Sequence, residues 1–227
     1  MTPPAEPPLI RLRGVSVFYG DRPALAELDL EVGKNERLWI TGPSGAGKTT
    51  LLRLLCGAVR AERGEVEVDG VRLDRAGRRD LERLRRRLGI VFQDPRLIAG
   101  FTLHENLALG LEASGERPER MAPKIERVLA RVGLAGRGAG FPPALSGGEQ
   151  QRAAVARALV REPRILLADE PTGNLDAESA RAVTELLEDA WIRGTTLLIA
   201  THDRDLAARP GGRILRLERG RIAAVTP

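Results

Sequence analysis

The chain has 227 residues, 42% of them hydrophobic and 30% charged, which is enough for one α/β domain with a buried core. The formal net charge is +5, and all but three of the 36 basic residues are arginine, so a general preference for arginine explains this charge as well as an anionic partner does. One cysteine, Cys56, excludes an intrachain disulfide framework, and no apolar run reaches the roughly 20 residues that a membrane-spanning helix needs.

The N-terminal segment is rich in proline and lacks the basic-then-apolar form of a signal peptide. Residues 1–8 are expected to be a disordered tail, and residues 9–227 to form the folded domain. We therefore expect a cytoplasmic protein, for which any attachment to the membrane would come through a partner.

Strand and helix patterns alternate after the tail. The strands predicted in chain order are 10–18, 25–32, 37–41, 65–73 (a hairpin turning at Asp69-Gly70), 88–92, 164–168, 195–200, 213–217 and 221–225. Helices are predicted at 48–57, at about 177–191 and within a helical subdomain at about 94–160, where residues 133–143 are expected to be a flexible connector. This order predicts a mostly parallel sheet with helices on both faces and an N-terminal antiparallel β element.

An arginine-rich segment, residues 78–89, reads as a solvated helix face because acidic residues are interspersed in it. The alternative is contact with anionic lipid headgroups or with an acidic loop of a partner.

Residues 42–49, GPSGAGKT, match the GxxxxGK[ST] pattern of a P-loop. Glycines let the backbone approach phosphate, and the start of the next helix adds free N–H groups. Lys48 is expected to neutralise the β- and γ-phosphates, Thr49 to bind Mg²⁺, and Thr50 to reach the α-phosphate. The predicted ATP-binding residues here are Gly42, Pro43, Ser44, Gly45, Ala46, Gly47, Lys48, Thr49 and Thr50. The fold class is therefore α/β, a P-loop NTPase; a plain glycine turn is the alternative.

Further polar residues follow other predicted strands. The apolar residues 165–168 lead into Asp169, expected near Mg²⁺, and Glu170, expected to orient or deprotonate the attacking water. Gln93 is expected to touch Mg²⁺ or that water, and His202 to hydrogen-bond the γ-phosphate. Because parallel strands present their carboxyl ends at one edge, one active site is predicted there. A lone histidine such as His104 is assigned to packing or surface.

A second anion site is predicted at residues 145–152, LSGGEQQR, 98 residues after Lys48 (146 − 48). Ser146 is a strong helix N-cap, and Gly147 and Gly148 are poor for helix stability, which favours the close approach of a ligand. An ordinary capped helix is the alternative. The motif has no lysine of its own, so it is expected to complete a site in a second copy.

These motifs, in this order over about residues 9–225, resemble the ATP-binding cassette (ABC) transporter ATPases. The resemblance implies ATP and Mg²⁺ as cofactors and a head-to-tail homodimer in which Ser146 of one copy closes on ATP held by Lys48 of the other. It implies that Tyr19 stacks on adenine, and that residues 173–176, GNLD, cross the dimer interface, with Asp176 at the nucleotide.

Local sequence at 90–115, 141–152 and PTGNLD resembles the cell-division branch of this family. That implies an integral membrane permease-like partner, docking near residues 93–106, and a conformational signal that regulates cell-wall hydrolysis. ATPases of lipoprotein release or macrolide export share PTGNLD and are the first alternative. A soluble ATPase acting on DNA or ribosomes is remote, because the chain has one cassette without a long insertion; no nucleic-acid partner is expected.

Overall fold

The computed structural model describes residues 7–203 and 211–226. The chain forms two compact units: unit 1 comprises Met1–Arg85 with Leu198–Pro227, and unit 2 comprises Arg86–Leu197. Most of the proposed disordered tail lies outside the described residues, and Pro7 and Pro8 belong to no strand or helix. The residues that the sequence assigns to a helical subdomain, about 94–160, lie within unit 2, which also includes strands and a further helix.

The first sheet of unit 1 is entirely antiparallel and confirms the predicted N-terminal β element. Its strand order is β2-β1-β4-β5, with bounds β1 Ile10–Tyr19, β2 Arg22–Val32, β4 Arg63–Val68 and β5 Val71–Arg72. The predicted turn joins β4 to β5, and both Asp69 (φ 47°) and Gly70 (φ 75°) are left-handed, as a two-residue hairpin turn requires.

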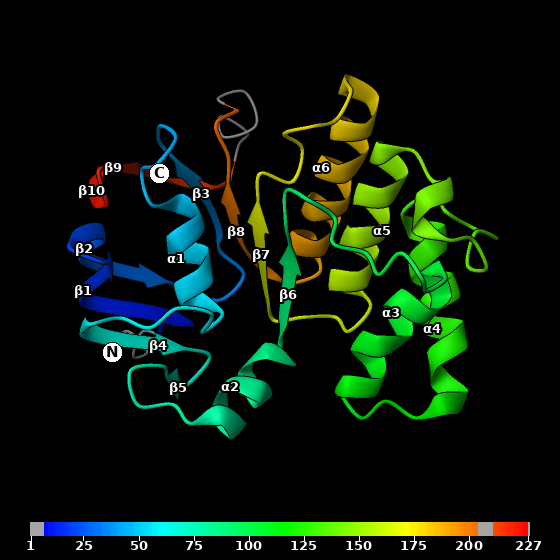
Figure 1. Ribbon diagram of the computed structural model, residues 1–227, viewed down its shortest axis with the longest axis horizontal. Helices are drawn as coiled ribbons and strands as arrows, with labels where there is room; N and C mark the ends of the chain where they lie inside the picture. Colours follow the sequence, from blue (N-terminus) through cyan, green and yellow to red (C-terminus); the bar gives the residue numbers. More distant parts are fainter. Residues whose placement is uncertain (1–6, 204–210, 227) are drawn as a thin grey trace, which may run out of the picture. The chain divides into compact units, whose positions relative to one another are not determined.

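The second sheet of unit 1 carries the P-loop. Its strands run in the order β10-β9-β3-β8, with bounds β3 Arg37–Thr41, β8 Thr196–Ala200, β9 Arg213–Glu218 and β10 Arg221–Thr226. Strands β3 and β9 are parallel, and β10 is antiparallel to β9. All of β8 and all of β3 before Thr41 are buried, which accounts for the apolar runs at residues 38–40 and 197–200. Helix α1, Lys48–Leu55, follows β3 (Figure 1).

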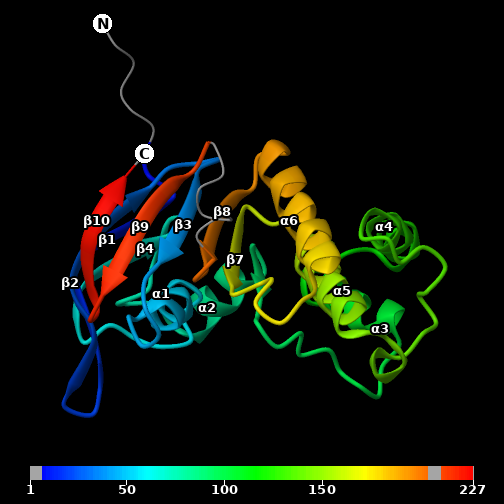
Figure 2. The ribbon, with the colours of Figure 1, turned by 90° about the horizontal axis from the view of Figure 1, so that it is seen from above.

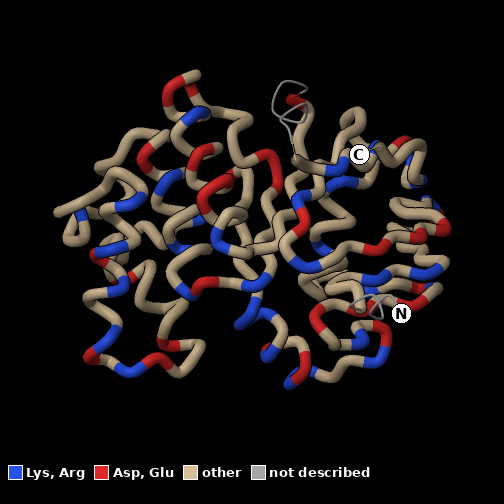
Figure 3. The backbone as a smooth tube through the Cα atoms, turned by 180° about the vertical axis from the view of Figure 1, so that it is seen from behind, with Lys and Arg blue, Asp and Glu red and all other residues tan. Residues whose placement is uncertain are grey.

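The arginine-rich segment forms helix α2, Arg78–Arg85, as predicted for its first part. Figure 3 shows basic residues gathered on it. Part of this charge is used within unit 1, because Arg78 pairs with Glu82 at 2.9 Å and Arg85 donates hydrogen bonds to the carbonyls of Cys56 (3.1 Å) and Gly57 (2.8 Å). Cys56 is buried, and that burial raises the pKa of its thiol, as expected for a core cysteine.

Unit 2 combines parallel strands with five helical segments in its described residues. Strand β6, Leu88–Val91, pairs in parallel with β7, Ile165–Asp169, and β8 follows β7 in the strand order. The helices are α3 Leu103–Ala113, α4 Pro118–Arg131, η1 Pro142–Ala144, α5 Gly147–Leu159 and α6 Ala177–Ile192. Helices α5 and α6 lie side by side in both views of the ribbon (Figures 1 and 2). No helix in the described parts of the chain is long and apolar enough to cross a membrane.

The connector at residues 133–143 has defined backbone contacts, in contrast to the flexible segment that its composition predicts. The carbonyls of Gly140 and Gly138 accept hydrogen bonds from the amides of Leu103 and His104, both at 2.8 Å. The first N–H groups of a helix have no partner inside it, so α3 takes its acceptors from this connector.

The start of α3 is also capped by its own residues. The hydroxyl of Thr102 accepts a hydrogen bond from the Glu105 amide, and the Glu105 carboxylate accepts one from the Thr102 amide at 2.7 Å. Asn106 is fully buried; its amide nitrogen donates to the carbonyls of Ile98, Phe101 and Thr102, and its oxygen accepts from the Ile98 amide. The loop before α3 is therefore shaped by α3 itself.

The capping box at α3 predicts a pH-dependent contribution to stability. The hydrogen bond from the Thr102 amide, followed by that from its hydroxyl, lowers the pKa of Glu105. An unfolded glutamate titrates near pH 4.3, so the stabilisation is fully present above that pH and is lost as the pH falls through the lowered folded value. We expect Glu105→Gln to lower the urea midpoint at pH 7, and the difference from wild type to shrink below about pH 4.

The matched control is Glu112→Gln, on the same helix, because the Glu112 carboxylate makes no hydrogen bond to the described residues. Its urea midpoint should follow wild type at every pH. A shift for Glu105→Gln of equal size at pH 7 and pH 3 would contradict the capping explanation.

Candidate functional site

The glycines of the P-loop are required by the backbone that surrounds it in unit 1. Gly42 has φ 144°, and a Cβ there would lie 2.2 Å from the carbonyl oxygen of Leu217. Gly47 has φ 107°, and its Cβ would lie 2.6 Å from the carbonyl oxygen of Ala24. Any side chain at either position would displace main chain, so this loop shape excludes residues other than glycine.

Helix α1 begins directly after the loop and offers an anion site. Its N-cap, Gly47, supplies no side-chain cap for the first N–H groups of α1, as the predicted phosphate site requires. Lys48 is largely buried, and its ammonium group donates to the carbonyls of Gly42 (2.8 Å) and Pro43 (3.3 Å). Thr49 is exposed and Thr50 buried. The ammonium is thus held over the loop where a phosphate would need it.

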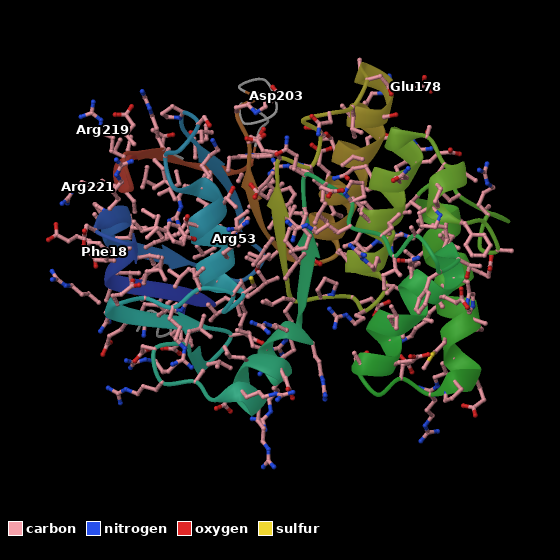
Figure 4. The ribbon with its side chains drawn as sticks, viewed as in Figure 1. Phe18, Arg53, Glu178, Asp203, Arg219 and Arg221 are labelled. Atoms are coloured by element: carbon pink, nitrogen blue, oxygen red, sulfur yellow. The ribbon has the colours of Figure 1, made fainter. Side chains whose placement is uncertain are left out.

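Unit 1 also brings His202 to the end of the P-loop strand. The amide of Thr201 donates to the carbonyl of Ile40 at 3.0 Å, and the hydroxyl of Thr201 accepts from the Asp203 amide at 3.0 Å. His202, between them, is exposed. Asp203 is seen directly after β8 (Figure 4).

Tyr19 is the last residue of β1, one residue beyond the strand predicted at 10–18. The strand continues because Tyr19 pairs with Arg22 at the turn into β2. The residue is 51% exposed, which is compatible with the predicted stacking on adenine.

Unit 2 gathers the other predicted catalytic residues at one strand edge. Strands β6 and β7 are parallel with Val91 opposite Ala168, so Gln93 and Glu170 leave the sheet at the same edge. A Cβ at Gly173 would lie 3.5 Å from the Glu170 Cβ and 3.6 Å from the Gln93 amide nitrogen. The two side chains therefore flank Gly173, as the convergence of strand ends predicts within this unit.

Glu170 has a left-handed backbone, with φ 46°. For a non-glycine residue this conformation costs roughly 1–2 kcal/mol. Asp169 ends β7 and is half-buried, and the Gly173 amide returns to the Glu170 carbonyl at 3.2 Å. Strain of this kind at an acidic residue on a strand end is typical of a functional position.

The signature segment starts α5 with a second capping box. The Ser146 hydroxyl accepts from the Glu149 amide at 3.2 Å, and the Glu149 carboxylate accepts from the Ser146 amide at 2.9 Å. That backbone bond is the main cause of the lowered pKa of Glu149. Ser146 remains exposed, so its O–H proton can be donated to an anion at the positive end of this 13-residue helix.

The two signature glycines differ in their surroundings. A Cβ at Gly147 would meet nothing within 4 Å, whereas a Cβ at Gly148 would lie 2.2 Å from the Ser179 hydroxyl oxygen and 2.8 Å from its Cβ. At Gly148 the contact with α6 of the same unit is by itself enough to require glycine, and the predicted contact with a ligand stays a prediction.

Asp176, the last residue of the segment 173–176 that is predicted to cross the dimer interface, also contacts Ser179. It is the N-cap of α6, and its carboxylate accepts the Ser179 amide at 2.9 Å, a bond that lowers the pKa of Asp176. Glu178, in the same first turn, is seen at the upper end of α6 (Figure 4). The starts of α5 and α6 are therefore built around Ser179.

These residues fit a Mg²⁺–nucleotide better than a metal held by protein alone. Among the described residues no group of three or more His, Cys, Asp or Glu side chains could hold a metal ion. Magnesium at phosphate sites needs only one or two protein ligands besides phosphate and water. The predicted ligands Thr49, Gln93 and Asp169 are of this kind.

Two buried residues of unit 2 were missed by the sequence analysis. Gln151 donates to the carbonyls of Phe92 and Pro171, on either side of the predicted catalytic segments, and Asn106 shapes the loop after Gln93. The sequence does hold a signal for Gln151. It lies three residues after Gly148, so the two residues share one face of the predicted helix.

Known proteins are similar to most of the chain in sequence and in fold. Residues 25–173 match the family model described as ABC transporter. The chain is 43% identical over 201 residues to the cell division ATP-binding protein FtsE of Mycobacterium tuberculosis, covering 88% of this chain and 87% of that protein. It is 40% identical over 227 residues to the methionine import ATP-binding protein MetN of Mesorhizobium japonicum, covering 99% of this chain and 62% of MetN. The dimeric post-hydrolysis structure of the cassette MJ0796 bound to ADP and Pi aligns with a TM-score of 0.87 at 33% identity, over 96% of this chain and 97% of that one.

The contact between α5 and α6 predicts an asymmetric effect of alanine at the two signature glycines. Gly148→Ala should destabilise the protein by about 1–3 kcal/mol, the usual result of overpacking, because its methyl group overlaps Ser179. Gly147→Ala should change stability by no more than about 0.5 kcal/mol. Urea unfolding measures both.

A double-mutant cycle separates this packing from other causes. Adding Ser179→Gly to Gly148→Ala should recover most of the loss after correction for Ser179→Gly alone. If the two changes were additive, Ser179 would not be the group that requires glycine at position 148.

Proposed function

The chain belongs to the ABC transporter family and hydrolyses ATP, and from this premise we propose that it is the ATPase subunit of an FtsEX-type complex in cell division. In this role, ATP cycles would produce a conformational signal that crosses the membrane and regulates cell-wall hydrolysis. The observation that best supports this proposal is the similarity to FtsE, which spans most of both chains. By contrast, this chain covers only 62% of MetN.

The ATPase of a lipoprotein-release or macrolide-type export complex is the second candidate. The sequence PTGNLD at residues 171–176 is shared by these branches of the family and is compatible with either role. The active-site residues are the same in both cases, and only the membrane partner differs.

We propose that the predicted site residues bind and hydrolyse ATP. Bound Mg²⁺–ATP would supply the γ-phosphoryl group and an electrophilic phosphorus. Lys48 and the first N–H groups of α1 bind the phosphates, with Thr49, Asp169 and Gln93 as metal or water ligands. Glu170 orients the attacking water and accepts its proton, and His202 holds a γ-phosphate oxygen. The products are ADP and phosphate.

The signature segment would act across a homodimer. Ser146, Gly147 and Gly148 carry helix N–H groups and a hydroxyl but no cation, so they would complete a nucleotide site that Lys48 of a second copy holds. The dimeric MJ0796 cassette bound to ADP and Pi supports this arrangement. Asp176 would lie near the nucleotide, and Tyr19 would stack on adenine.

The membrane partner would be an FtsX-like permease that docks on the loop before α3. Ile98 and Phe101 expose 44% and 38% of their surface there, and Asn106 fixes the loop from beneath. Apolar side chains on a fixed loop suit the apolar face of a partner helix. Through that partner the protein would be held at the cytoplasmic face of the membrane, with no nucleic acid involved.

Glu170→Gln tests the catalytic assignment. We expect the hydrolysis rate to fall by roughly a hundredfold or more, the scale of lost acid–base function, while ATP still binds. The variant should then accumulate as an ATP-bound dimer, measured by light scattering with Mg²⁺–ATP. Glu162→Gln, another acidic residue of unit 2 with positive φ, is the control and should behave as wild type. A variant that remains monomeric with ATP would count against the two-copy site.

Affinity purification from native membranes tests the biological role. Tagged Glu170→Gln protein should bring down a membrane protein required for division, identified by mass spectrometry. Ile98→Ser combined with Phe101→Ser should lose that partner and keep ATP binding, because both side chains are exposed and outside the P-loop. Recovery of a lipoprotein-release or export permease would replace the proposed role and leave the ATPase assignment intact.

A further inference from the structure

Gln151 is a buried amide that holds two separate backbone segments. The residue is only 2% exposed. Its side-chain nitrogen, Nε2, lies 3.1 Å from the Phe92 carbonyl oxygen and 3.0 Å from the Pro171 carbonyl oxygen. Two acceptors face this atom, so it must be the NH₂ group, since an oxygen there would meet two other oxygens. Both of its N–H bonds are thus committed.

The two carbonyls flank the residues predicted to handle water and metal. Phe92 directly precedes Gln93, and Pro171 directly follows Glu170. Gln151 itself belongs to α5, one helical turn after the signature residues Gly147 and Gly148. One side chain therefore joins the signature helix to both catalytic segments of unit 2.

Packing alone does not account for an amide at this position. The second polar atom of the group, Oε1, is buried and accepts no hydrogen bond from the described residues. A buried polar atom without a hydrogen bond costs free energy. An apolar residue would fill the same space without that cost. The two donated bonds are what an apolar side chain of the same size would lack.

We propose that Gln151 is a positioning residue for ATP hydrolysis, which transmits the position of the signature helix to Gln93 and Glu170. This rests on the roles proposed above for those two residues. When the signature residues engage a γ-phosphate, α5 shifts, and the two hydrogen bonds carry the main chain around Gln93 and Glu170 with it. The turnover step would then depend on Gln151, whereas nucleotide binding by the P-loop would not.

The test is Gln151→Met, which keeps the side-chain length and removes both N–H donors. We expect kcat for ATP to fall by about 10- to 100-fold, the effect of misplacing a reacting group by about 1 Å, with KM within about threefold of wild type. An unchanged kcat, or a change confined to KM, would overturn the proposal.

Thr195→Val is the matched control for stability. The Thr195 hydroxyl donates to the Pro163 carbonyl at 3.2 Å, another buried tie between segments, but at the amino end of β7 instead of its carboxyl end. It should lower the urea midpoint as Gln151→Met does and leave kcat unchanged. An equal loss of kcat in both variants would show a general effect of destabilisation and overturn the proposal.

Hydrogen exchange of the unmodified protein keeps the test valid if Gln151→Met does not fold. Peptides covering the amides at 92–94, at 172–173 and in the first turns of α5 should share one opening free energy and gain protection together with Mg²⁺ and a non-hydrolysable ATP analogue. Independent exchange of these segments would overturn the proposal.

Glu170→Gln, measured in parallel, keeps the two hypotheses distinguishable. If Glu170→Gln hydrolyses ATP at the wild-type rate, the assigned role of Glu170 fails, and the inference about Gln151 fails with it. If Glu170→Gln is inactive and Gln151→Met is fully active, only the inference about Gln151 is overturned.

Discussion

A phosphate-binding loop must keep its N–H groups for the ligand, so its shape has to be fixed from outside. In unit 1 this is done by main chain. The turn between β9 and β10 donates from the Gly220 amide to the Ala46 carbonyl at 3.0 Å, and the Gly220 carbonyl accepts from Ala26 in β2 at 2.8 Å. Contact with the Leu217 carbonyl then requires glycine at position 42. A residue some 170 positions later in the chain thus dictates the composition of the loop.

In unit 2, loops that carry predicted site residues are held in shape by side-chain amides. Asn106 makes four hydrogen bonds to the loop after Gln93, and Gln151 makes two to the ends of β6 and β7. Each is buried, where a hydrogen bond left unmade costs about 1–3 kcal/mol. An amide can reach main chain of different segments without forming a strand. The loops between can therefore bear exposed residues such as Gln93 while their ends stay fixed.

The sequence was most informative where local chemistry decides structure. Apolar runs at residues 38–40 and 165–168 indicate the buried parts of β3 and β7, and the Asp69-Gly70 pair indicates the turn. Ser146 and Glu149, three residues apart, form a capping box. Contacts between distant residues could not be predicted. That Gly148 faces Ser179, or that the connector at 133–143 binds the start of α3, depends on how helices pack, and no short pattern records it.

The strained backbone of Glu170 shows why such distant contacts matter for the chemistry. Left-handed φ at a glutamate persists only where neighbouring residues hold it. The next residue, Pro171, has a fixed φ by its ring, and its carbonyl is held by Gln151. On the other side Asp169 is part of β7, paired with β6. Asp169 and Pro171 are both held in place, so the change in chain direction between them falls on the backbone of Glu170. Its carboxylate is set by the ends of β7 and α5 together, so a change at either end would move it without any change in Glu170 itself.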